Sequence, residues 1–222
     1  MSSQIHEDVL PQLAALSIQT DRPLIITDAD EVLFHFMEGL EVFLEQQDMY
    51  FDWSSFALHG NIRHKGDKEP VDGKQIPILL NLFFEEHCHT LPAAPGAAEH
   101  LELLSKDAQI IVLSNVPPKF AHLRREGLQK NGMDFPLIAN IGPKGQVVKH
   151  LASGMEAPVF FIDDIPTNHS SVSKHANHVE RVHFIADKRL ANLLGPAEHS
   201  NVRLDSWPEI RDHIQDIMNK GL

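Results

Sequence analysis

Short apolar runs alternate with helical patterns along most of this 222-residue chain, and this alternation constrains the fold more than any other feature. The runs are rich in Ile, Val, Leu and Phe and have the length of buried strands. They cover residues 24–27, 109–113, 137–139, 159–162 and 182–185. Helical patterns lie between them at 96–105, 118–130, 144–153 and 168–176. This order predicts βαβ units, and therefore an α/β protein with a Rossmann-like, three-layer α/β/α arrangement around a central parallel sheet.

The remaining segments complete this plan. Residues 5–18 place apolar side chains at helical spacing, and residues 209–219 follow Pro208 with a second amphipathic pattern. Residues 36–92 interrupt the alternation, because two helical stretches flank a polar, glycine-rich segment at 59–74. We interpret this region as a small helical insert between the first two strands. The expected domains are a core of residues 1–35 and 93–222 and an insert of residues 36–92.

Charge and composition exclude several classes of protein. The chain has 31 acidic and 19 basic residues, a net charge of −12, which argues against nucleic-acid binding and against docking on an anionic membrane. A single cysteine, Cys88, forms no internal disulfide, and neither a membrane span nor a signal peptide is expected. We therefore expect a soluble cytoplasmic protein. The 15 histidines have no explanation from composition.

Polar residues follow three of the predicted strands at the point where each strand ends. They are Asp28 and Asp30, Ser114 and Asn115, and Asp163 and Asp164. The carboxyl ends of parallel strands border the ligand crevice, so neighbouring strands would bring four carboxylates together. Crowded carboxylates repel one another and require a cation, and oxygen ligands favour Mg²⁺. If residues 28–30 are extended, Asp28 and Asp30 share a face, so that one can attack while the other transfers a proton.

The segments that carry these residues resemble the four motifs of the haloacid dehalogenase superfamily, in the same order. Residues 24–33 resemble the first motif and residues 111–115 the second. Lys144, which opens a helix after Gly142-Pro143, resembles the third, and residues 160–168 are similar to the fourth. A helix led by Pro95-Gly96 also resembles the one that often precedes the second motif.

The resemblance implies a role for each residue of the first three motifs. Asp28 would be the nucleophile that forms an aspartyl-phosphate, and it would also bind Mg²⁺. Asp30 would be the general acid and base, and its backbone carbonyl would bind the metal. Ser114 would hold a phosphoryl oxygen, with Asn115 beside it in the substrate site. Lys144 would neutralise the nucleophile and the transferring phosphate.

The resemblance also assigns the fourth motif and the insert. Asp164 would bind the metal directly, Asp163 would support it, and Asn168 would tie the following loop to the site. Residues 36–92 lie where this superfamily inserts a cap that closes over the site and helps to select substrates.

Several positions depart from the common pattern or allow a second interpretation. Glu31-Val32 stands where Gly-Thr is commonest, so the turn after Asp30 is expected to differ. Lys149 is an alternative to Lys144 for the third motif. Arg124 and Arg125 are interpreted as part of a solvated helix face.

The sequence therefore favours an Mg²⁺-dependent phosphatase that acts on a small phosphorylated metabolite. A dehalogenase would have no use for Asp30. A phosphonatase would need a Schiff-base lysine from the insert, where Lys65 and Lys68 are available. A phosphosugar mutase would use the same two aspartates, and a binding module that has lost turnover is the alternative outside the enzymes.

Overall fold

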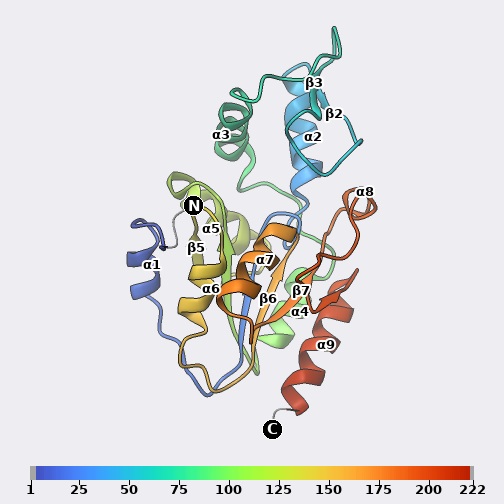
Figure 1. Cartoon of the computed structure of the whole chain (residues 1–222). Helices are drawn as coiled ribbons and strands as arrows, with labels where there is room; N and C mark the ends of the chain where they lie inside the picture. Colours follow the sequence, from blue (N-terminus) through green and yellow to red (C-terminus); the bar gives the residue numbers. More distant parts are fainter. Residues whose placement is uncertain (1–3, 221–222) are drawn as a thin grey trace.

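A six-stranded parallel sheet forms the centre of the computed structural model, which describes residues 4–220 (Figure 1). Its strands are β1 (Leu24–Thr27), β4 (Gln109–Ser114), β5 (Leu137–Ala139), β6 (Val159–Asp163), β7 (Glu180–His183) and β8 (Val202–Arg203). They lie in the order β5-β4-β1-β6-β7-β8, and every neighbouring pair is parallel. The predicted parallel sheet is confirmed, and β1 lies inside it between β4 and β6.

The far edge of the sheet differs from the prediction. β7 begins at Glu180 and ends at His183, which pairs with Asp163, the last residue of β6. Because β6 offers no partner beyond Asp163, Phe184 and Ile185 leave the sheet and bury their side chains in the core instead. The two-residue strand β8 and the short helix α8 (Lys188–Ala191) were not predicted, since elements of this length carry no periodic pattern.

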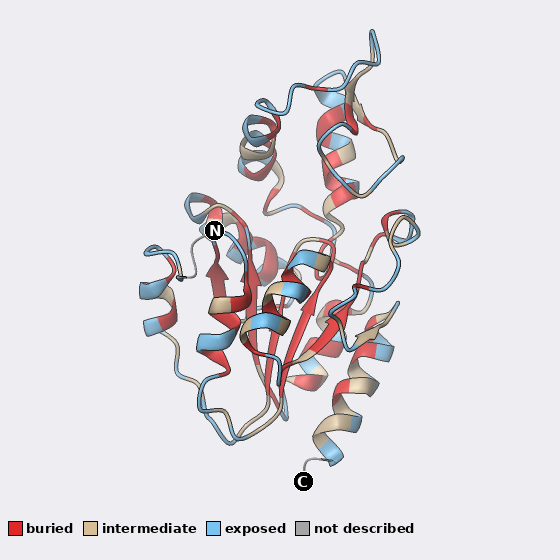
Figure 2. Cartoon of the chain, in the orientation of Figure 1, coloured by how far each residue is buried: buried red, intermediate tan, exposed pale blue. Residues whose placement is uncertain are grey.

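Helices cover both faces of the sheet, so the three-layer prediction is confirmed (Figure 2). On one face lie α1 (Leu10–Ala14), α6 (Gly145–Leu151) and α7 (Pro166–His175). On the other lie α4 (Ala97–Leu104), α5 (Ala121–Lys130), which follows the 3-10 turn η1 (Pro118–Phe120), and α9 (Trp207–Lys220). Alternate residues of β1 serve the two layers: Leu24 and Ile26 pack in one, and Ile25 packs in the other.

The first helix is shorter than predicted. The pattern at residues 5–18 predicts a helix over the whole segment, whereas α1 spans only Leu10–Ala14. Pro11 explains the difference, because a proline inside a longer helix would remove a hydrogen bond and clash with the preceding turn. It is tolerated in the first turn, which is where α1 places it.

The inserted segment contains the two predicted helices together with a strand pair that was not predicted. Its elements are α2 (Phe36–Gln46), β2 (Met49–Phe51), β3 (Ile62–His64) and α3 (Ile76–His87), and β2 and β3 are antiparallel. α2 packs on α3 through aromatic rings, with the Phe36 and Phe83 centroids 5.0 Å apart. Figure 1 shows these elements beyond the carboxyl ends of the central strands.

Several contacts attach this segment to the core. The chain leaves and re-enters the core through neighbouring segments, since Phe34 and Ala93 form a β-bridge and the His35 amide donates to the Pro92 carbonyl at 2.9 Å. Farther along, Arg189 of α8 forms an ion pair of 2.7 Å with Glu41 of α2. None of the helices formed by residues 4–220 is long and apolar enough to cross a membrane.

Candidate active site

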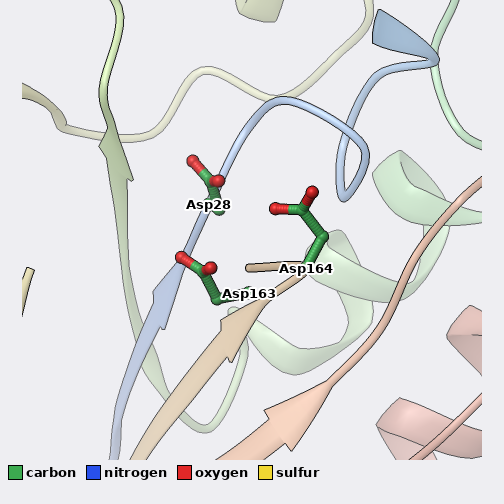
Figure 3. Close-up of side chains that lie close together, drawn as sticks. All are labelled: Asp28, Asp163 and Asp164. Atoms are coloured by element: carbon green, nitrogen blue, oxygen red, sulfur yellow. The ribbon is translucent and has the colours of Figure 1, made fainter. Parts of the chain in front are cut away.

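Three aspartates meet where the carboxyl ends of β1 and β6 lie side by side (Figure 3). Asp28 follows β1, Asp163 ends β6, and Asp164 comes next. The chain continues from β1 to β4 on one side and from β6 to β7 on the other, so this is the point where strand connections diverge and ligands bind in open α/β sheets. One oxygen from each carboxylate lies within 4.8 Å of the others, and all three residues are buried.

A buried lysine joins two of these carboxylates. The Nζ atom of Lys144 lies 2.7 Å from Asp28 Oδ1 and 2.7 Å from Asp163 Oδ2, and its side chain is inaccessible to solvent. Burial by itself lowers the pKa of Lys144, but the two carboxylates outweigh this and raise it, so the ammonium stays charged. Lys149, the alternative from the sequence, is exposed on α6. The geometry therefore favours Lys144 over Lys149.

The residue after Lys144 explains how the lysine reaches the site. Gly145 begins α6, where a Cβ atom would lie 2.3 Å from the carbonyl oxygen of Ser171 on α7. Only glycine allows this close approach of the two helices. The start of α6 is thereby held against α7, and Lys144 is placed beneath the ends of β1 and β6.

Asp163 and Asp164 have different surroundings. Asp163 accepts hydrogen bonds from the Ile165 amide at 2.9 Å and from the Asn168 side chain at 3.0 Å, in addition to Lys144. Burial, together with Asp163 and Asp28, raises the pKa of Asp164 well above its ordinary value. Three buried carboxylates against one ammonium leave an excess of negative charge, so this donor set fits a hard divalent cation. Of the three carboxylates, that of Asp164 has the fewest contacts with other residues, so its oxygens are the most available to bind a cation.

The residues that follow β4 border the same end of the sheet. Ser114 is buried, and its Oγ accepts a hydrogen bond of 3.3 Å from the Val116 amide. Asn115 is exposed, and its amide group bonds the loop after β5 through Asn140 at 2.8 Å and the Gly142 carbonyl at 3.2 Å. Asn115 therefore holds two loops together, and its binding of substrate stays a prediction.

Comparisons with known proteins agree with this geometry at the level of the fold. No family model and no curated protein matches the chain. Among solved structures, a haloacid dehalogenase-like protein from Agrobacterium tumefaciens has a TM-score of 0.60 at 14% identity, over 87% of this chain and 97% of that one. A hydrolase of the same family from Deinococcus radiodurans, with bound phosphate and sodium, has a TM-score of 0.59 at 16% identity, over 90% and 97%. A predicted phosphoglycolate phosphatase from Haemophilus somnus gives 0.57 at 14% identity, over 90% and 100%.

The chain has the haloacid dehalogenase-like fold. The expected fold class is therefore confirmed.

Within this haloacid dehalogenase-like fold, Asp30 is placed differently from the sequence-based expectation. The expectation was that residues 28–30 are extended and that four carboxylates converge. The chain instead turns after Asp28, and the carboxylate of Asp30 forms an ion pair with Arg124, with Oδ1 and Nη2 2.5 Å apart. Three carboxylates form the cluster, and Asp30 lies outside it. Metal binding through the Asp30 backbone carbonyl stays a prediction.

The interpretation of Arg124 and Arg125 as part of a solvated face of α5 is wrong for Arg124. Its side chain is completely buried, whereas its neighbour Arg125 is exposed. The sequence contains a signal for this, because Phe120, Arg124 and Leu128 follow one another at intervals of four residues and so share one face of the helix. Both outer members of this row are buried apolar residues.

Glu31 takes a backbone conformation that explains why glycine is commonest at this position of the first motif. Its φ angle is +55°, in the left-handed region. The buried carboxylate accepts hydrogen bonds from the Met37 amide in the first turn of α2 at 2.6 Å and from the Asp187 amide at 2.9 Å. Burial raises the pKa of Glu31 to about 7. Glu31 thus joins the start of the insert to the loop that follows β7.

Two buried histidines that the sequence analysis left unexplained support the aspartates of the fourth motif. His169 Nε2 lies 2.9 Å from the carbonyl oxygen of Asp163, and His183 Nε2 lies 3.0 Å from that of Asp164. His183 Nδ1 also accepts from the Ala197 amide at 3.0 Å. Burial lowers the pKa of both rings to about 4, so both are neutral near pH 7 and donate through Nε2. They fix the backbone that carries Asp163 and Asp164.

These histidines make the protein sensitive to acid. Each ring binds a proton near pH 6.5 when unfolded but only near pH 4 when folded, so stability present above pH 6.5 is lost as the pH falls toward 4. The loss is up to about 3 kcal/mol for His169. In EDTA, we expect His169→Gln, which keeps a donor and does not titrate, to reduce the fall in melting temperature between pH 7 and pH 5. The exposed residue His122 gives the matched control, His122→Gln, and equal acid sensitivity in all three proteins would contradict this account.

Proposed function

We propose that the protein is an Mg²⁺-dependent phosphatase that hydrolyses a small phosphorylated metabolite. The observation that carries the proposal is the group formed by Asp28, Asp163, Asp164 and Lys144, in which one ammonium contacts two carboxylates at 2.7 Å. Asp28 supplies a nucleophile, Lys144 a fixed positive charge, and the two remaining aspartates a place for a cation. A dianionic phosphate ester can approach an anionic nucleophile only where such positive charge offsets the repulsion.

The proposed reaction has two steps that use the same residues. In the first, a carboxylate oxygen of Asp28 attacks phosphorus, the ester P–O bond breaks, and Asp30 gives a proton to the departing alcohol. In the second, Asp30 takes a proton from water, which attacks the aspartyl-phosphate and releases inorganic phosphate and free Asp28. Lys144 and the Ser114 hydroxyl hold phosphoryl oxygens throughout.

Asp28 and Asp164, with the backbone carbonyl of Asp30, would hold Mg²⁺ in this proposal, and Asp163 would support them. When bound, Mg²⁺ supplies positive charge that stabilises the phosphoryl oxygens. The fit of three crowded carboxylates to a divalent cation supports this assignment. The bound phosphate of the Deinococcus radiodurans hydrolase, which shares the fold, also supports it.

A small-molecule substrate follows from the position of the insert. Residues 36–92 lie over the carboxyl ends of the central strands, and we propose that they act as a cap that selects the substrate (Figure 1). Nucleic acid and membrane surfaces are disfavoured as partners by the net charge of −12. A cytoplasmic location stays a prediction from the sequence.

The other reactions considered from the sequence have less support. A phosphonatase would need a free lysine near Asp28. Lys65 is ion-paired with Glu45 beside the β2–β3 pair, and Lys68 is exposed in the loop after β3. A dehalogenase would not use Asp30. A mutase would use the same residues and would differ only in the acceptor of the phosphoryl group. A binding module without turnover would have no need of a nucleophile paired with a lysine.

Metal removal tests the proposed function. When the Mg²⁺ in the assay is replaced by excess EDTA, we expect phosphate release from a panel of phosphorylated metabolites to fall by at least about 100-fold. Without a cation to offset their negative charge, the carboxylates repel the substrate. Phosphate is measured colorimetrically, and restoring Mg²⁺ is the control for irreversible damage. A protein that releases no phosphate from any ester in Mg²⁺, or releases it equally in EDTA, would contradict the proposal.

A further inference from the structure

The contact between Asp30 and Arg124 is the feature of the site that the proposed reaction does not yet explain. Arg124 lies on α5, outside the four motifs, and its side chain is wholly buried, while that of Asp30 is 22% exposed. Among residues 4–220, only one oxygen of Asp30 has a hydrogen-bond partner, since Oδ1 accepts from Arg124 Nη2. The carboxylate is therefore held at one oxygen, and Oδ2 is the oxygen left to exchange a proton.

The surroundings of Arg124 compensate its buried charge only in part. Its guanidinium makes cation-π contacts with the ring of Phe34 at 5.1 Å and the ring of Phe84 at 6.0 Å. Among the described residues, its Nε and Nη1 atoms have no hydrogen-bond partner. Burying a guanidinium with two unpaired donors costs stability, and this cost is only partly offset by the ion pair with Asp30 and by the two rings. A buried charge that is only partly compensated, beside a reacting group, points to a role in function.

We propose that Arg124 is a positioning residue that holds Oδ1 of Asp30, so that Asp30 exchanges its proton with the substrate and with water through Oδ2. This inference rests on the proposed function, because it concerns the proton that Asp30 gives to the departing alcohol. Arg124 touches neither the substrate nor the phosphorus, and it acts only through Asp30. Arg124 itself forms no covalent bond and accepts no proton during the reaction.

The position of Arg124 also links the insert to the chemistry. Phe34 belongs to the segment through which the chain enters the insert, and Phe84 belongs to α3 within it. The guanidinium therefore packs between the core and the insert. Arg124 therefore contacts both Asp30 and the two rings at the junction with the insert.

The leaving group provides a test that separates proton donation from general damage. Phenyl phosphate and 4-nitrophenyl phosphate have similar size, but only phenolate is basic enough to need a proton as it leaves. The measured quantity is kcat/KM, which reports formation of the aspartyl-phosphate, the step in which the alcohol departs. We expect Arg124→Met to lower kcat/KM for phenyl phosphate by about 10–100-fold more than for 4-nitrophenyl phosphate, a part of the usual effect of a general acid.

Matched variants complete the experiment. Arg125→Met removes an exposed arginine from the same helix and should leave kcat/KM unchanged for both esters. Arg124→Lys retains a positive charge without the planar fork, so partial recovery with phenyl phosphate is expected, and this variant gives the same comparison if Arg124→Met does not fold. In an Asp30→Asn background, adding Arg124→Met should leave the ratio of the two kcat/KM values unchanged, because the residue through which Arg124 acts has already been disabled.

The outcomes distinguish this inference from the proposed function. Equal losses with both esters, or no loss with either, in an active protein would overturn the role of Arg124 and leave the phosphatase proposal standing. A further change of the ratio in the Asp30→Asn background would also overturn it. A wild-type protein that releases phosphate in Mg²⁺ from neither aryl ester and from no member of the metabolite panel would overturn both.

Discussion

Replacing Asp28 by asparagine is expected to abolish phosphate release, with a loss of at least about 10⁴-fold in kcat. An amide oxygen is a poor nucleophile, so the aspartyl-phosphate does not form, and one predicted ligand of Mg²⁺ is weakened at the same time. The fold should survive, because the substitution preserves volume and removes one of three crowded carboxylates. The measurement is phosphate release in Mg²⁺ from the best substrate of the metabolite panel.

The control for this variant is a matched substitution far from the site. Asp107 is exposed just before the start of β4, at the opposite end of the sheet, so Asp107→Asn should retain wild-type turnover. Melting temperatures of both variants in EDTA show that any loss of turnover is chemical. If Asp28→Asn hydrolysed phosphate esters at the wild-type rate, the assignment of the nucleophile would be wrong.

Replacing Lys144 by methionine is expected to cause the largest loss of stability among substitutions in this site, about 3–5 kcal/mol in metal-free buffer near pH 7. The variant leaves the carboxylates of Asp28 and Asp163 buried beside each other with no cation between them. Burial already raises the pKa of Asp28, and removing Lys144, which lowers it, raises this pKa further. The lost stability therefore returns as the pH is lowered and Asp28 takes up a proton. Turnover should also be lost, because no fixed charge faces the phosphate.

Urea denaturation at pH 7 and at pH 5, with and without Mg²⁺, measures this effect. Mg²⁺ should restore part of the stability of Lys144→Met, since a bound cation stabilises the folded state. Lys149→Met is the control, because Lys149 is exposed on the same helix and should change stability by no more than about 0.5 kcal/mol. If the two substitutions changed stability equally, Lys144 would not be the residue whose positive charge stabilises the buried carboxylates of Asp28 and Asp163.

The sequence predicts the central strands well for a physical reason. β1, β4, β5 and β6 are buried between two helical layers, so their residues are almost continuously apolar and end abruptly where the sheet ends. The same abrupt ends locate Asp28 and Asp163, because the first polar residue after such a strand lies at the edge where ligands bind. At the sheet edge this signal fails, and β7 begins with the polar residues Glu180 and Arg181.

The parts of the site that the sequence analysis missed depend on contacts between distant residues. Arg124 pairs with Asp30 across 94 residues, and a motif search has no reason to include it. His183 lies in a strand whose apolar pattern explains it as a core residue, although its ring supports the backbone of Asp164. The orientation of Asp30 was also out of reach, because a pattern of alternate aspartates does not reveal the turn at Glu31.

The bridge between Phe34 and Ala93 has a consequence for how such a chain can be altered. The two points at which the core is interrupted remain hydrogen-bonded neighbours, so the core holds the ends of the insert together. The entropy of closing a loop grows only slowly with its length, by about 0.6 kcal/mol for each doubling. Segments of very different size can therefore be exchanged at this junction with little penalty to the core, which makes it a natural graft point for altering substrate choice while the aspartates and Lys144 stay in place.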